Sequence, residues 1–228
     1  MIVRIIMPEF PNFVQAIRCG NVDEVNCLLD SHTDWLNAET DQGISPLMLA
    51  IYHRQEDIIQ SLLGRDPIIK IFEAAALGML PVLEHHFKCR PESVNTYSCD
   101  GFTPLGLSSF FGQLEAAECL IRFGADVNQT ARNDFRVTPL HSAAAANDFK
   151  MAELLVEHGA EVNIRQRAGV TPLHSAAHNG NIDLTRLLLD NDADTNARLD
   201  SGETPLCLAL SDEHQQVAEL LRQYGADA

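Results

Sequence analysis

Apolar residues recur along this chain in short clusters that repeat one another. VTPLHSA occurs at 137–143 and again at 170–176, and the variants FTPLGLS and ETPLCLA occupy 102–108 and 203–209. Each is followed by a second apolar cluster at helical spacing, such as MAELLV or LTRLLL. The pattern therefore predicts pairs of short helices repeated along the chain.

The repeated threonines fix the period. Thr103, Thr138, Thr171 and Thr204 are separated by 35, 33 and 33 residues. A period near 33 that carries T-P-L-H is the signature of ankyrin repeats, so the chain resembles the ankyrin repeat family. The resemblance implies an all-α solenoid of about seven helix-turn-helix repeats joined by short β-hairpin fingers, in which each repeat is too small to be stable without its neighbours.

Weaker copies extend the repeat toward the N-terminus. ISPLMLA puts Ser45 in the threonine position, and IKIFEAAALG at 69–78 and PNFVQAIRCG at 11–20 fit the same frame. Repeats are predicted to start near residues 11, 45, 69, 103, 138, 171 and 204, so that residues 1–228 form a single domain. The segments FEAAALG and RVTPLHSA are similar to those of small stand-alone ankyrin proteins of bacteria.

One repeat is too short to be complete. Only 24 residues separate Ser45 from Ile69, which leaves no room for a finger near 64–69. We expect a bend or an altered stacking angle at 63–70, with residues 1–66 forming a partly independent block.

Another finger is longer than its neighbours. Asn128 precedes Thr138 by ten residues, whereas Asn163 precedes Thr171 by eight. The two extra residues predict that the fourth finger protrudes.

The repeated motif has a physical rationale. A threonine hydroxyl can accept a hydrogen bond from a free amide in the first turn of a helix, and the proline after it fills a position that needs no amide donor. The resemblance implies that His141 and His174 hydrogen-bond the backbone between neighbouring repeats. Gly124, Gly159 and Gly225 each stand 21 residues after a threonine, where the left-handed conformation that ends a helix favours glycine.

Composition narrows the classes of partner. Lys and Arg total 16 against 32 for Asp and Glu, a formal net charge of -16, which argues against nucleic acid and anionic membranes as partners. No stretch approaches the eighteen or so apolar residues of a membrane span, so we expect a soluble, cytoplasmic monomer. The six cysteines form no CxxC pair and most fall within helical patterns, which favours buried thiols in a reducing compartment.

No motif of catalysis or cofactor binding is present. GxSxG, GxxxxGK[ST], HExxH and GxGxxG are all absent, so we assign no catalytic, cofactor or metal residue and do not expect an enzyme. His174 and His178 share a helical face at i, i+4 spacing, but no third metal ligand is evident. A metal- or thiol-dependent regulator or enzyme that uses this pair, or a cysteine, is kept as an alternative.

Function is therefore expected on the surface. Stacked repeats form a concave groove from the fingers and the first helices, whose exposed side chains the fold leaves free to vary. Four phenylalanines fall at such positions, which suggests a binding hot spot. The predicted partner-binding residues are Tyr52, Phe102, Phe110, Phe111, Phe135, Arg136, Arg167 and His178.

The last three fingers also carry positive charge. A basic ridge of Arg132, Arg136, Arg165, Arg167 and Arg198 could receive an acidic peptide. The leading hypothesis is a non-catalytic module that binds an unknown protein or peptide as a scaffold, adaptor or inhibitor. A structural adaptor that self-associates through the aromatic patch is a further alternative.

Overall fold

The computed structural model describes residues 9–227 and is all-α, as the sequence predicts. These residues form fourteen α-helices and three short 3-10 helices, with no strand among them. They divide into two compact units, one ending at Glu73 and the other beginning at Ala74. The single domain over 1–228 and the bend at 63–70 stay predictions.

The first unit contains two complete helix pairs. The helices are α1 (Phe10–Cys19), α2 (Val22–Ser31), α3 (Pro46–Tyr52) and α4 (Glu56–Leu63), with a 3-10 turn at Thr33–Asn37. Trp35 is 2% exposed and its ring lies 5.6 Å from that of Phe13. His32 stacks on Trp35, with the ring centroids 4.0 Å apart.

Between α4 and α5 (Ile71–Ala76) the finger is missing, as predicted. Residues 64–70 alone connect the two helices. Asp66 takes a left-handed conformation there, with a φ of 57°. The amide of Ile68 donates to Asn37 Oδ1 at 2.7 Å, so this short connection is tied to the preceding turn.

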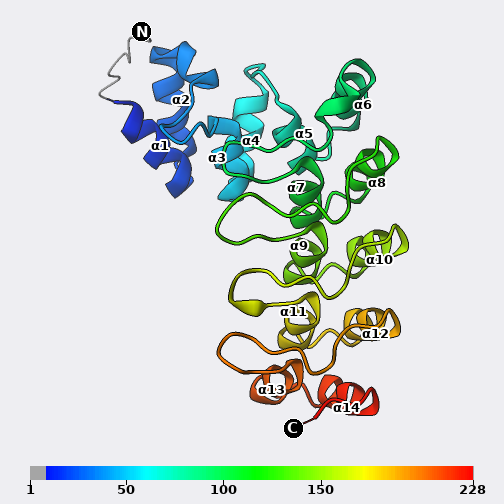
Figure 1. The fold of residues 1–228 in the computed structure, drawn as a ribbon. Helices are drawn as coiled ribbons and strands as arrows, with labels where there is room; N and C mark the ends of the chain where they lie inside the picture. The colour runs from blue at the N-terminus through cyan, green and yellow to red at the C-terminus, as the bar shows by residue number, and fades with distance from the viewer. Residues whose placement is uncertain (1–8, 228) are drawn as a thin grey trace. The chain divides into compact units, whose positions relative to one another are not determined.

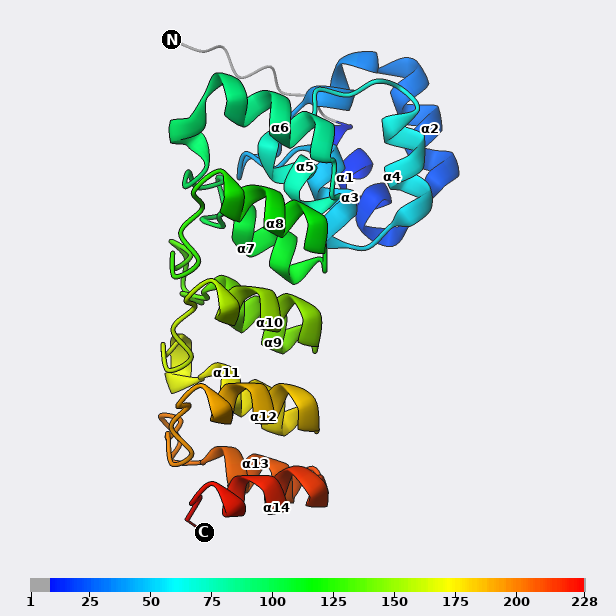
Figure 2. The ribbon, with the colours of Figure 1, turned by 90° about the vertical axis from the view of Figure 1, so that its right-hand side faces the viewer.

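The second unit is a regular stack of helix pairs (Figures 1 and 2). Its helices are α6 (Leu80–Cys89), α7 (Pro104–Phe110), α8 (Leu114–Arg122), α9 (Pro139–Ala145), α10 (Phe149–Glu157), α11 (Pro172–His178), α12 (Ile182–Asp190), α13 (Pro205–Ser211) and α14 (Gln215–Gln223), with 3-10 turns at Pro91–Ser93 and Arg167–Gly169. The inner helices α7, α9, α11 and α13 form one column, and the outer helices α8, α10, α12 and α14 form the other.

Hydroxyl caps start the inner helices. Each capping oxygen accepts a hydrogen bond from the amide three residues later, as seen at Ser45, Thr103, Thr138 and Thr204. The cap satisfies an amide that has no partner within the helix. At Thr171 the hydroxyl lies 2.8 Å from His174 Nδ1, as that of Thr138 does from His141 Nδ1, and the amide of His174 also donates to the carbonyl of Thr171 at 3.1 Å.

The histidine of T-P-L-H joins one repeat to the next. His141 Nδ1 accepts from the amide of Thr138 at 3.3 Å, so the neutral ring carries its proton on Nε2. Nε2 then donates to the carbonyl of Val170 in the following repeat, at 3.2 Å. The predicted role is confirmed for His141. His174 Nε2 is buried and forms no hydrogen bond among the described residues, so the structure does not show the predicted role there.

The finger asparagines provide a second link between repeats. Asn163 Nδ2 donates to the carbonyl of Asp192 at 2.9 Å, and its Oδ1 accepts from the amide of Asp194 at 2.8 Å. The same pair of bonds to the following repeat is made by Asn95, Asn128 and Asn196. Each carboxamide thus satisfies a carbonyl at the end of an outer helix and the amide two residues beyond it.

The fingers are closed loops and not β-hairpins, which corrects the prediction. One backbone hydrogen bond crosses the base of each finger of the second unit: Ser98 to Phe102, Ala131 to Val137, Gln166 to Val170, and Leu199 to Glu203. The other bond within each finger spans its turn, as from Gly101 N to Ser98 O, so the two bonds do not form the ladder that defines a strand pair. Successive fingers are joined by one further bond each, such as Arg132 N to Gly101 O at 2.8 Å.

We expect acid to destabilise the fold through His141. Burial lowers the pKa of His141 to about 4 from an ordinary value of 6.5, so the unfolded chain binds this proton first. The stabilisation is complete above pH 6.5 and is lost as the pH falls toward 4, by about 3 kcal/mol. Urea denaturation followed by circular dichroism at neutral pH and near pH 4 measures the loss. An unchanged pH dependence in His141→Gln would contradict this assignment.

We expect Asn163→Ala to lower the free energy of unfolding by about 1–2 kcal/mol, because both hydrogen bonds to the next repeat are lost. Asn191→Ala is the matched control, since its side chain bonds only Leu187 O within its own helix. The control should stay within about 0.5 kcal/mol of wild type. Urea unfolding of both variants makes the comparison, and equal losses would show that the bridge contributes nothing specific.

Candidate functional site

Two predicted aromatic residues meet at the end of α7. Phe110 is the last residue of the helix and is 42% exposed, while Phe111 is half-buried. Their rings pack edge to face, with centroids 5.1 Å apart and planes at 89°. Gly112 then takes a left-handed conformation, with a φ of 69°, and ends the helix. This edge-to-face contact with Phe111 holds the ring of Phe110 at the surface.

The other two predicted phenylalanines lie on fingers. Phe102 is half-buried at the base of its finger, where its amide donates to Ser98 Oγ at 2.9 Å. Phe135 is 58% exposed near the tip of the next finger. Among the described residues neither ring contacts Phe110. The structure therefore brings two of the four phenylalanines together and separates the other two.

Tyr52 and His178 occupy positions equivalent to that of Phe110. Tyr52 is the half-buried last residue of α3, in the first unit. His178 is the exposed last residue of α11, and its Nδ1 lies 2.7 Å from Asp212 Oδ2. His214 Nε2 approaches the carbonyl of His178 at 3.0 Å. These contacts tie the end of α11 to the following repeat.

The predicted basic ridge divides into two classes of arginine. Arg132 lies over the ring of Tyr97 at 4.1 Å, and Arg165 pairs with Asp200 at 3.5 Å. Arg198 is also engaged, through a hydrogen bond to a carbonyl of its own finger. The remaining two, Arg136 and Arg167, are exposed and form no ion pair with any residue from 9 to 227.

Comparison with known families agrees with this architecture. The family described as "Ankyrin repeats (many copies)" matches residues 140–189 and 176–222, and "Ankyrin repeat" matches residues 100–132. The chain belongs to the ankyrin repeat family. Ankyrin repeats form a protein–protein interaction module and are typically non-catalytic.

Curated relatives match over small parts of their length. The serine/threonine-protein kinase VIK of Arabidopsis thaliana is 42% identical over 69 residues, which cover 30% of this chain and 15% of the kinase. Rabankyrin-5 of Homo sapiens is 39% identical over 72 residues, covering 31% and 6%. Neurogenic locus notch homolog protein 1 of Xenopus tropicalis is 30% identical over 143 residues, covering 57% and 6%. The chain thus spans no more than 15% of the length of any of these three.

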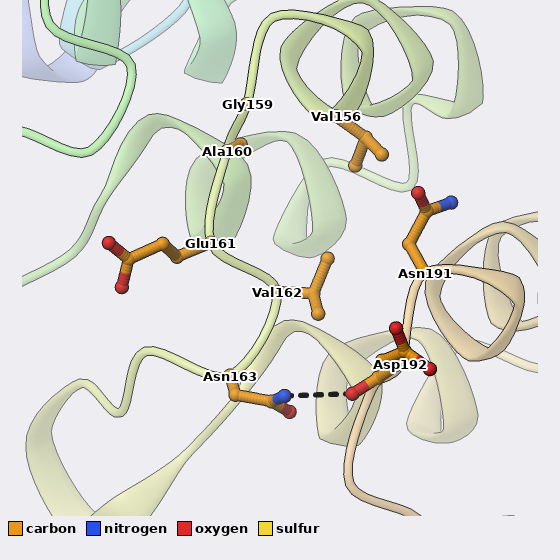
Figure 3. Close-up of a pocket in the computed structure, with 8 residues that line it drawn as sticks. All are labelled: Val156, Gly159, Ala160, Glu161, Val162, Asn163, Asn191 and Asp192. Atoms are coloured by element: carbon orange, nitrogen blue, oxygen red, sulfur yellow. Dashed lines mark hydrogen bonds between the residues drawn. The ribbon is translucent and has the colours of Figure 1, made fainter.

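A hollow of about 430 Å³ opens between two ankyrin repeats, where the ends of α10 and α12 meet (Figure 3). Val156 and Val162 line it, and the hydrogen bond from Asn163 to Asp192 crosses its lower edge. The polar groups of that bridge are already satisfied by each other. The hollow is therefore a consequence of how the repeats are linked.

Residues 9–227 contain neither a metal-binding cluster nor a helix that could span a membrane. In the described part of the chain no three His, Cys, Asp or Glu side chains are grouped to hold a metal ion. His174 is buried against Thr171, and His178 is paired with Asp212. None of the helices within 9–227 has the length and apolar character of a membrane span. The metal- or thiol-dependent alternative stays a prediction with no third ligand to support it.

The cysteines are less buried than predicted. Cys19, Cys27, Cys89 and Cys99 are exposed, and Cys119 is the one buried thiol of the six. Cys19, Cys27 and Cys89 lie on exposed sides of their helices, and Cys99 lies in the turn of a finger, so the prediction of burial was wrong for these four. Burial raises the pKa of Cys119, whereas the hydroxyl of Thr204 lowers the pKa of Cys207.

The repeat pattern alone did not predict that every inner helix is followed by a residue in the left-handed backbone conformation. The residue nine positions after each repeat start has positive φ, at Gly20, Arg54, Gly78, Gly112, Asn147, Gly180 and Glu213. Four of these seven residues are glycines, which favour positive φ, so the sequence did carry a signal for this turn. At Gly180 a Cβ would stand 2.5 Å from His214 Nδ1, so the ring of the next repeat requires glycine there. This turn places the ends of α7 and α11 on the surface.

We expect the finger arginines to differ in their effect on stability. Arg132→Ala should lose about 0.5–1 kcal/mol with the contact to Tyr97. Arg136→Ala and Arg167→Ala should each stay within about 0.5 kcal/mol of wild type, because neither guanidinium forms an ion pair with described residues. Urea midpoints measured by circular dichroism test this. A loss above that range at Arg136 or Arg167 would give the side chain a structural role.

Proposed function

We propose that this ankyrin repeat protein is a non-catalytic module that binds a partner protein or peptide on the face formed by the inner helices and fingers. The observation that carries the proposal is the exposed ring of Phe110, held in place by Phe111 at the end of α7. Aromatic residues of this kind provide much of the binding energy at protein interfaces. Phe110 is thus a candidate anchor for a partner.

The inner helices next to α7 end in side chains that differ from Phe110 in size and polarity. α9 packs between α7 and α11 (Figure 1). Its exposed end carries Ala145 and Ala146, and α11 then ends in the exposed His178. A large apolar side chain, two small ones and a polar one therefore follow each other from repeat to repeat. Such a graded surface favours one partner shape over others.

The role as scaffold, adaptor or inhibitor depends on what the partner does. Phe102 and His178 extend the predicted binding set of the second unit, and Tyr52 is the equivalent candidate in the first unit. Phe102 is held by the backbone bond that closes its finger, whereas Tyr52 and His178 are held at the ends of their helices. A rigid surface loses little conformational entropy on binding. The cytoplasmic location and the monomeric state are further predictions, and self-association through the aromatic pair is the competing use of the same surface.

The proposal is tested by affinity purification of partner proteins, comparing recovery by the wild-type protein with recovery by Phe110→Ser. Ile68→Ser is the matched control, because Ile68 is 70% exposed and lies outside the inner-helix face of the second unit. We expect a partner to be recovered by wild type and Ile68→Ser and to be reduced at least tenfold with Phe110→Ser, a loss of about 1.4 kcal/mol or more. Circular dichroism confirms that each variant is folded.

Equal recovery by both variants would remove Phe110 from the binding surface. A concentration-dependent mass in sedimentation that disappears in Phe110→Ser would instead support self-association. Failure to recover any partner with the wild-type protein would count against the proposed function.

A further inference from the structure

Phe135 is the most exposed aromatic side chain among the described residues, at 58%. It stands on the finger that carries the two extra residues. Water-exposed phenylalanine gains nothing for folding, since the hydrophobic contribution comes from burial. Its position therefore calls for an explanation other than stability.

The backbone around Phe135 is fixed by hydrogen bonds on both sides. Asn133 Oδ1 accepts from the amides of Phe135 and Arg136, at 3.1 and 3.3 Å. Asn133 Nδ2 donates to the carbonyl of Asp100 at 3.1 Å. On the other side, the carbonyl of Phe135 accepts from the amide of Arg167 at 3.0 Å. Three consecutive fingers thus fix the backbone that carries the exposed ring, which lowers the entropic cost of binding to it.

Two arginines adjoin Phe135 along the backbone. Arg136 follows Phe135 in sequence, and Arg167 is bonded to it through the backbone. Both are exposed and form no ion pair with any described residue. Fingers 128–137 and 163–170 together contain four arginines and a single acidic residue, in a chain whose formal net charge is -16. The positive charge is therefore local.

We propose that Phe135, Arg136 and Arg167, here called the fingertip site, bind an acidic segment of a partner protein in which carboxylates flank a large apolar side chain. The inference rests on the proposed protein-binding function and names the chemistry of the partner. Arginine pairs with carboxylate through two parallel hydrogen bonds, and Phe135 supplies apolar contact between the two guanidinium groups. The acidic remainder of the molecule disfavours nucleic acid, whose phosphates it would repel.

Peptide selection on the folded full-length chain tests the fingertip site. A library of random short peptides displayed on phage is selected on the wild-type protein, and the recovered peptides are synthesised with a fluorescent label. Their Kd values are then measured by anisotropy for wild type, Phe135→Ser and Arg136→Ser/Arg167→Ser. Lys150→Ser/Arg222→Ser is the matched control, because it removes the same charge from exposed positions of α10 and α14.

We expect the selected peptides to combine Asp or Glu with Phe, Leu or Trp. Kd should rise about tenfold or more in both fingertip variants and stay within about twofold of wild type in the control. Added salt should weaken wild-type binding and have a smaller effect on Arg136→Ser/Arg167→Ser, because the charge contacts are screened.

Four outcomes would overturn the fingertip site. Peptides without acidic residues, or peptides whose affinity falls with Phe110→Ser and not with the fingertip variants, would leave the proposed function standing and place binding elsewhere. Tighter binding of single-stranded DNA or of phosphatidylserine vesicles than of any peptide, lost in the fingertip variants, would assign the site to another polyanion. Recovery of no binding peptide would count against both proposals.

Discussion

The link between one repeat and the next is the interaction on which the second unit depends. A single helix pair cannot bury its own apolar face, and its outer helix ends in carbonyls with no partner of their own. The carboxamides of the finger asparagines bond those ends across the repeat boundary, and His141 does the same from the inner helix. Because each of these bonds crosses a boundary, a repeat is stable only in its stack.

Because these residues build and link the repeats, positions at the helix ends and finger tips are not needed to specify the fold. Buried threonine, proline and leucine hold the inner helices, so the residues at the helix ends and finger tips can change without loss of the fold. Phe110 and Phe135 occupy such positions, and both are large, apolar and exposed. Both are therefore the candidates on which the two proposals rest.

The two surfaces differ in how they present an aromatic ring. Phe110 is supported by a second ring, Phe111, at the end of a helix, whereas Phe135 is supported by backbone hydrogen bonds among fingers. The helices next to α7 end in small and polar residues, whereas Phe135 adjoins two arginines that form no ion pair with the described residues. The two proposals therefore rest on different chemistry, shape at the inner helices and charge at the fingertip site.

The sequence by itself determined the period, the helix pairs, the hydroxyl caps and the missing finger, because each depends on local spacing or on residue types with one favoured conformation. The bridging role of His141 came from the resemblance to the ankyrin repeat family. Tertiary structure decided the rest. Only packing between repeats showed that Arg132 and Arg165 are engaged while Arg136 and Arg167 are not, and that Phe111 is half-buried beneath Phe110. These outcomes depend on contacts between residues of different repeats or on the side of a helix that faces solvent, and repeat spacing does not encode either.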